Sequence, residues 1–330
     1  LALKGTFSFE AGLQDDIEIA TGVPANVGAA LDTFGLQAIA DAIAGVAGVT
    51  IGTDFSTISG WDVFSILVGA SNVSGFAGFG NPDFSDVDWA QSDDLFGFIL
   101  DGVDLALGIM ESTFDQIQGL KQFIGLHATA DTVSFTAYGS DWMTVDADYV
   151  EIVINDNPDN WPGGIGPAVI DWKATDWNDG DVAEGLQVPT GMGLETVTID
   201  WDGNQRIGVS AQDVVIHLLD FLHLQGSIFF EKGPQQLVTL GTGLPQNLGA
   251  LGSLIQPLLD AITGLAGVDL SADLSTITGW DVATMMLGMS GVMGFAGFGN
   301  PDFSDVDWAQ SDDLFGFILD GVDLALGIME

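Results

Sequence analysis

Apolar and polar residues alternate along two parts of the chain, and this alternation predicts β-strands. In Leu1–Ala20, the segment GTFSFE alternates and DIEIA follows a turn. In Leu126–Glu231, apolar runs are separated by turns rich in Gly, Asn, Asp and Pro. The strand faces predicted there are Val133/Phe135/Ala137, Val145/Ala147, Val150/Ile152/Ile154, Val209/Ala211 and Val214/Ile216/Leu218.

Between these two parts, apolar residues recur at helical spacing. We expect a helix from Asn26 to Val49 and a second one that begins at Ser59, with Asp62 three residues later as in a capping box. The second helix is predicted to end in the glycines of Gly69–Gly80, and a third is predicted over Ser92–Ile124. The apolar face of the third helix comprises Leu95, Phe98, Ile99, Leu105, Ile109 and Phe114, and its polar stripe comprises Asp94, Asp101, Asp104, Glu111, Asp115 and Gln118.

The chain also contains a long internal repeat. The block GFAGFGNPDFSDVDWAQSDDLFGFILDGVDLALGIME at Gly75–Glu111 recurs unchanged at Gly294–Glu330. Leu1–Gly12 resembles Leu222–Gly233, so the period is about 220 residues, the size of one or two domains. A weaker echo relates VSFTAYGSDWMTVDADYVEIVI to VTIDWDGNQRIGVSAQDVVIHL. We expect this sequence to be one full repeat and half of the next, cut from a longer tandem array.

Together, these patterns predict an α+β fold built from tandem repeats of about 220 residues, each with a helical block and a β-rich block. The β-rich block is expected to be a sandwich or an irregular solenoid. The expected divisions are 1–25, strands that end a preceding β block; 26–125, the helical block of repeat 1; 126–245, a β-rich block; and 246–330, the helical block of repeat 2.

The charge of the chain excludes several kinds of partner. Lys and Arg total 5 against 47 acidic residues, for a net charge of −42, so nucleic acids and anionic membranes are disfavoured. The absence of cysteine rules out disulfides and zinc thiolates. Val282–Pro301 carries no charge, but it lacks flanking Lys or Arg, and we expect a buried helix and a Gly-rich loop here instead of a transmembrane span.

Acidic loops are the candidate cation sites, because short Asp and Asn side chains supply the oxygen ligands that Ca²⁺ prefers. No cluster has EF-hand spacing or the nonapeptide of calcium-binding β-rolls. The alternative interpretation is a solvated turn whose Asp caps the next segment. The candidate ligands are Asn81, Asp83, Asp86 and Asp88, their repeats Asn300, Asp302, Asp305 and Asp307, and the cluster Asp176, Asn178, Asp179 and Asp181. A further cluster is NDNPDN, with Asn155, Asp156, Asn157 and Asp159.

Several tryptophans are adjacent to aspartates, as in Trp61-Asp62 and Asp171-Trp172. If exposed, such pairs would suit sugars. If the rings point inward and the carboxylates outward, they are ordinary strand or helix ends, which is the interpretation we favour. The sequence has no nucleophile elbow and no phosphate loop, and no pair of carboxylates stands out, so no enzymatic activity is predicted.

Long, acidic, cysteine-free repeats rich in Asp, Gly and Thr, with strands such as MTVDADYVEIVI at Met143–Ile154, resemble the giant surface proteins and large adhesins of aquatic bacteria. The resemblance implies secretion to the cell surface, dependence on calcium or salt, and a role as stalk, filament or coat. The partners would be neighbouring repeats or identical subunits, which we expect to stack through their helical blocks. A carbohydrate-binding or carbohydrate-processing module that contacts surface glycans is the main alternative, and a membrane-associated helical block is a third.

Overall fold

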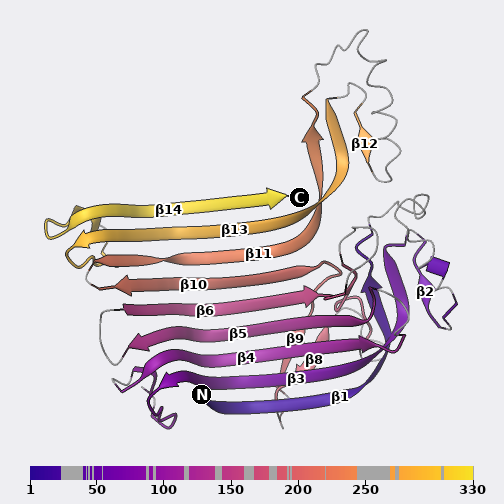
Figure 1. Cartoon of the computed structure of the whole chain (residues 1–330), viewed down its shortest axis with the longest axis horizontal. Coiled ribbons are helices and arrows are strands. Elements are labelled where there is room, and N and C mark those ends of the chain that lie inside the picture. Colours follow the sequence, from indigo (N-terminus) through magenta and orange to yellow (C-terminus); the bar gives the residue numbers. More distant parts are fainter. Residues whose placement is uncertain are drawn as a thin grey trace.

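Both the alternating and the continuous apolar runs of the chain form β-strands in the computed structural model, and most of these strands join one antiparallel sheet (Figure 1). The structure describes residues 1–23, 40–41, 43, 45–46, 48–53, 55–86, 89–91, 94–114, 119–137, 143–159, 167–177, 184–191, 193, 195–219, 221–243, 268–271, 275–305 and 308–329.

The main sheet is an up-and-down meander in which strands that follow each other along the chain lie side by side. Its order is β1-β3-β4-β5-β6-β10-β11-β13-β14, and three two-residue strands pair at one end of it. The long strands are β1 (Ala2–Ala20), β3 (Thr57–Phe79), β4 (Phe96–Ser112), β5 (Gln122–Ala137), β6 (Met143–Asp156), β10 (Arg206–Leu218), β11 (Leu222–Gly241), β13 (Thr276–Phe298) and β14 (Phe315–Met329). The short ones are β2 (Thr50–Ile51), β7 (Val169–Ile170) and β12 (Asp269–Leu270), and β8 (Leu186–Pro189) pairs with β9 (Thr196–Ile199) in a separate hairpin.

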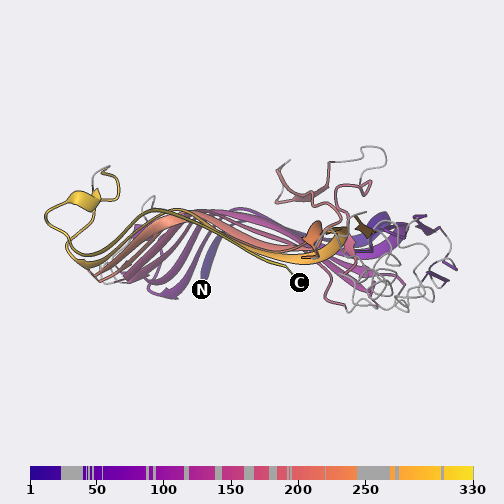
Figure 2. The same ribbon diagram turned by 90° about the horizontal axis from the view of Figure 1, so that it is seen from above.

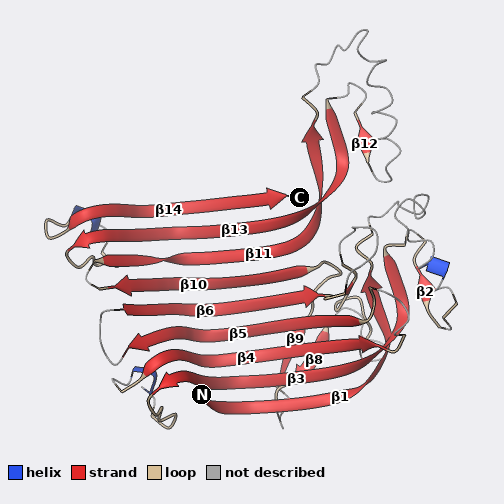
Figure 3. Cartoon of the chain, viewed as in Figure 1, coloured by secondary structure: helices blue, strands red, loops and turns tan. Residues whose placement is uncertain are grey.

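The predicted α+β fold is therefore wrong, because the segments expected to be helical are strands (Figure 3). The helix expected from Ser59 is β3, and the described part of the helix expected over Ser92–Ile124 contains β4 and the beginning of β5, while residues 92–93 and 115–118 lie outside the described residues. Val282–Pro301 lies mostly in β13. Most of the helix expected at Asn26–Val49 lies outside the described residues. Within the described part of the chain, no helix is long and apolar enough to span a membrane.

The physical reason is that β3 and β4 carry apolar residues on both faces. Trp61 and Val63 are fully buried, while Phe64, on the opposite face from Val63, is 41% exposed but equally apolar. A strand that is apolar on both faces reads as a continuous hydrophobic run, in which the alternation of a half-buried strand disappears. The strands expected in Leu1–Ala20 and in Leu126–Glu231 are present as β1, β5, β6 and β10.

Bulges cross the sheet near the middle of several long strands. In β3 the bulge contains Asn72, with φ of 49°, and in β4 it contains Gly102, with φ of 62°. The equivalent residues of the second repeat are Gly291 in β13 and Gly321 in β14, with φ of 59° and 60°. One extra residue at a bulge reverses which face the following side chains occupy and increases the twist of the sheet. Seen from above, the long strands form one curved layer (Figure 2).

The core forms where the segment between β6 and β10 covers one end of one sheet face. This segment carries β7 and the β8–β9 hairpin, and its Trp172 is fully buried against the sheet. A Cβ atom added to Gly108 of β4 would lie 3.0 Å from the Trp172 ring, so the tryptophan packs on the sheet at a position that has room only for glycine. At the other end, Trp89 and Leu95 of the β3–β4 connection pack on Phe76 and Ile99 in a second cluster.

Candidate functional site

The acidic loop after β3 is a capped turn. Asp83 accepts hydrogen bonds from the Ser85 backbone N–H at 3.0 Å and from the Ser85 hydroxyl at 2.5 Å. These two bonds, led by the side-chain one, hold the pKa of the exposed Asp83 carboxyl below its usual value. In the second repeat, Asp302 accepts the same bonds from Ser304, with the same effect on its pKa. The capping interpretation of this loop therefore has structural support.

In the described part of the chain, no group of three His, Cys, Asp or Glu side chains could hold a metal ion, although Asn300, Asp302 and Asp305 line one pocket beside the loop after β13. Asn81, Asp86, Asn300 and Asp305 are placed in the loops beside Asp83 and Asp302, and the half-buried Asp176 lies in the segment between β7 and β8. The remaining candidates, Asp88, Asp307, Asn178, Asp179 and Asp181, lie outside the described residues. Calcium binding stays a prediction.

The cluster NDNPDN holds the covering segment onto the sheet. Asn155 is 1% exposed; its amide nitrogen donates to the carbonyl oxygens of Ile170, Asp202 and Asn204 at 3.0–3.1 Å, and its amide oxygen accepts the indole N–H of Trp172 at 2.8 Å. Asn157 is also buried and donates to two backbone carbonyls. These amides satisfy loop carbonyls that would otherwise be buried without partners.

Five of the nine tryptophans face inward, as the favoured interpretation expects, whereas Trp177 and Trp280 are half-buried and Trp142 and Trp161 lie outside the described residues. Trp61 and Trp172 are fully buried, and Trp89, Trp201 and Trp308 are at most 8% exposed. A ring that stacks on a sugar must reach solvent, so these five cannot form an open sugar-binding platform in this conformation.

The boundary between the two repeats is the most informative surface of the molecule. The last long strand of repeat 1, β10, pairs with the first strand of repeat 2, β11, from Ile207↔Lys232 to Leu218↔Leu222. On its other edge β10 pairs with β6 over a similar length. The sheet therefore crosses the repeat boundary without a break (Figure 1).

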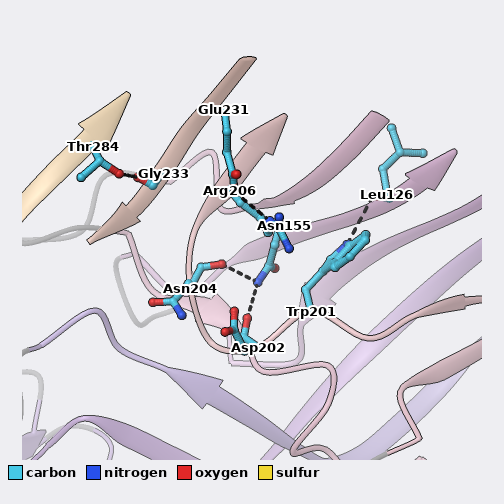
Figure 4. Close-up of polar contacts among 9 residues, drawn as sticks. All are labelled: Leu126, Asn155, Trp201, Asp202, Asn204, Arg206, Glu231, Gly233 and Thr284. Carbon is cyan, nitrogen blue, oxygen red and sulfur yellow. Dashed lines mark hydrogen bonds and ion pairs between the residues drawn. The ribbon is translucent and has the colours of Figure 1, made fainter. Parts of the chain in front are cut away.

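A partly buried ion pair spans this boundary. Arg206 of β10 donates from Nε to Glu231 Oε1 of β11 at 3.0 Å, and its guanidinium lies 5.0 Å from the ring centroid of Trp201 (Figure 4). Glu231 is 7% exposed. The Trp201 indole in turn donates to the Leu126 carbonyl of β5 at 3.3 Å. The pair thus links both repeats to the covering segment.

The two repeats have the same strand pairing as well as similar sequences. Phe9 of β1 pairs with Val68 of β3, and their equivalents Phe230 and Leu287 pair in β11 and β13. The Ser65 hydroxyl donates to the Gly12 carbonyl at 3.2 Å, and the equivalent Thr284 hydroxyl donates to Gly233 at 2.8 Å (Figure 4). The second repeat therefore begins the same sheet again.

A row of apolar residues also crosses the boundary uninterrupted. Residues directly opposite each other in an antiparallel pair share a face. The strand pairing places in one row Phe7, Ala70, Leu105, Ala128, Ile152, Val209, Phe230, Leu287 and Leu326, one from each long strand.

The boundary could be found in the sequence only in part. Arg206 and Glu231 are well separated along the chain, and no sequence motif contains both of them. The signal that was present is the repeat itself, which aligns Glu231 with Glu10 and thus shows an acidic residue at the same position near the start of each repeat.

Comparison with known proteins returns no match: no family model, no curated protein and no solved structure corresponds to this chain.

Proposed function

We propose that this chain is a structural repeat module of a secreted bacterial surface protein, filament or adhesin, in which each repeat lengthens one continuous β-sheet. The observation that carries the proposal is the pairing of β10 with β11 across the repeat boundary. Repeats that fold as separate beads would meet through loops and side chains, whereas these share backbone hydrogen bonds.

The ion pair at the repeat boundary supports the same function. In β11, Glu231 is paired with Arg206 from the repeat before it. The equivalent Glu10 of β1 is exposed, and no ion pair to it is found in the described part of the chain. Glu10 therefore occupies the position at which an arginine from a preceding repeat would form the equivalent ion pair.

The experiment that tests this proposal inserts one further repeat into the 330-residue chain and compares the two particles by small-angle X-ray scattering and electron microscopy. A repeat contributes the six long strands β1, β3, β4, β5, β6 and β10, so at about 4.8 Å per strand the sheet should lengthen by about 29 Å. A flexible chain of beads with variable spacing would refute the proposal.

The extracellular location and the stabilisation by cations belong to the same proposal and rest on the sequence. A net charge of −42 repels itself in a compact state, and dissolved or bound cations reduce that repulsion. Thermal unfolding in NaCl, in CaCl₂ and in chelator separates general screening from a specific calcium requirement, since only the latter distinguishes CaCl₂ from NaCl at equal ionic strength. The alternative glycan-binding function loses support because five of the seven tryptophans in the described part of the chain are buried.

A further inference from the structure

The outer edge of β14 has the sequence of a strand that is fully paired elsewhere in the same molecule. FGFILDGVDLALGIM forms β4 at Phe96–Met110 and β14 at Phe315–Met329. Both copies pair on one side with equivalent strands, β3 and β13, in the same register. On the other side β4 pairs with β5, whereas β13 is the single pairing partner of β14 among the strands that the structure describes.

The difference in pairing shows in the exposure of identical residues. Met110 is fully buried in the core cluster that includes Phe123 of β5 and Trp172 of the covering segment, while the equivalent Met329 is 58% exposed. Ala106 is fully buried in β4, and its equivalent Ala325 is exposed. The edge of β14 therefore leaves open the surface that β4 buries.

Two glycines on this edge match groups that belong to β5 and its covering segment. A Cβ atom added to Gly102 of β4 would collide with the Asp131 carboxylate of β5, but at the equivalent Gly321 there is nothing within 4 Å. Likewise Gly108 lies against Trp172, and the equivalent Gly327 has nothing within 4 Å. β14 therefore has glycine at the two positions where β4 contacts Asp131 of β5 and Trp172 of the covering segment.

We propose that the outer edge of β14 is a binding site for a strand with the sequence of β5, Gln122–Ala137, in the register that β5 adopts on β4. In that register Phe96 pairs with Ala137, Leu107 with Leu126 and Ile109 with Ile124, so the incoming residues Ala137, Leu126 and Ile124 face Phe315, Leu326 and Ile328. The inference deepens the proposed function, because it identifies the strand that a further repeat adds.

Backbone pairing gives such an edge its affinity, and side-chain matching gives it register. In the β4–β5 pair, Asp101 faces Thr132 and Asp104 faces Thr129. The acidic residues Asp320 and Asp323 of β14 would face the same two threonines, which accept a neighbouring carboxylate without charge repulsion.

The test uses the whole chain and a synthetic peptide with the sequence Lys121–Ala137. Because the natural chain has no cysteine, a single Leu326→Cys substitution, at a side chain that is 48% exposed, gives a unique reporter on the edge. The peptide is made in two versions, one with Leu126→Cys and one with His127→Cys. Disulfide formation between chain and peptide is measured under a mild oxidant, and hydrogen exchange of the unsubstituted chain is measured with and without the natural peptide.

We expect the Leu126→Cys peptide to form the disulfide at least about ten times faster than the His127→Cys peptide, whose side chain points to the opposite face. The natural peptide should slow hydrogen exchange in Phe315–Met329 and leave Ala2–Ala20 unchanged. Equal cross-linking by both peptides, protection of β1 in place of β14, or no protection at all would overturn the inference.

The same exchange data separate this inference from the proposed function. If the amides of β10 and β11 are protected but the peptide does not bind, the inference about β14 fails and the continuous sheet remains. If the β10 and β11 amides exchange freely in the chain alone, the continuous sheet itself is refuted.

Discussion

The ion pair at the repeat boundary should stabilise the chain measurably, because it joins two strands from different repeats. Arg206 and Glu231 lie 3.0 Å apart, and the Glu231 side chain is 9% exposed while that of Arg206 is 31% exposed. A hydrogen bond to a charged group contributes a net stabilisation of about 1.5–3 kcal/mol, and exposed ion pairs contribute about 0.2–1 kcal/mol. We therefore expect a coupling of about 1–2 kcal/mol between the two side chains at low salt.

A double-mutant cycle measures this coupling. Unfolding by urea is followed for the natural chain, Arg206→Ala, Glu231→Ala and the double variant, and the hydrogen exchange of β10 and β11 is followed in parallel. Arg206→Ala also removes the contact with Trp201, worth about 0.5–1 kcal/mol, so it should cost more than the pair alone. The coupling should decrease with added salt only in part, because Glu231 is mostly buried.

The chain supplies its own control at Glu10, the equivalent of Glu231 in the first repeat. Because Glu10 is exposed at the open edge of β1, Glu10→Ala should change the free energy of unfolding by less than about 0.5 kcal/mol. If Glu10→Ala destabilises the chain as much as Glu231→Ala, or if the cycle gives no coupling, the boundary is not held together by this pair.

Further predictions concern the covering segment and the acidic strands. Gly108→Ala should destabilise the chain by about 1–3 kcal/mol because the added methyl group meets the Trp172 ring, whereas the equivalent Gly327→Ala should be nearly neutral in the same thermal melts. Asn155→Ala should cost about 2–4 kcal/mol by urea titration, since it leaves the buried indole N–H and backbone carbonyls unpaired; a cost below 1 kcal/mol would contradict the role assigned to this amide. Partial desolvation raises the pKa of Asp146, so its ionised form destabilises the fold at neutral pH, and Asp146→Asn should raise the melting temperature at pH 7. That gain should decrease as the pH falls through the raised pKa of the folded state and should be lost well below pH 3.8, where the natural side chain is protonated in both the folded and the unfolded state; a gain that is independent of pH would exclude this explanation.

The sequence predicts strands correctly where one face of the sheet is polar, and it fails where both faces are apolar. In β4 the bulge at Gly102 adds a second source of error. The extra residue of the bulge lies between Asp101 and Asp104 and brings these two residues, three positions apart, to the same face, so their spacing imitates one turn of a helix. The contrary signal was the glycine content: Gly97, Gly102 and Gly108 would each cost a helix interior about 1 kcal/mol.

The candidate sites illustrate what local sequence can and cannot predict. That Asp83 caps a turn follows from residues two positions apart, so the capping interpretation was accessible from the sequence. The partnership of Arg206 with Glu231 depends on which strands become neighbours, and no local pattern contains that information. The repeat could have supplied it. The equivalent strands β1 and β11 pair with the equivalent strands β3 and β13, and β11 has β10 as a second long partner that β1 lacks in the described part of the chain.

Open edges are a hazard for any sheet protein, and the acidic composition limits this hazard without closing the edges to the correct partner. Exposed edges can pair with each other, and charged residues on an edge oppose this. Both outer strands carry acidic residues, among them Glu10 on β1 and Asp320 and Asp323 on β14, so association of two outer edges brings like charges together. The strand β5 has a single acidic residue, Asp131, and in its register on β4 the two aspartates face threonines and Asp131 lies against Gly102. The negative charge of the edges therefore selects among partners: it disfavours a second acidic edge and leaves a β5 strand unopposed.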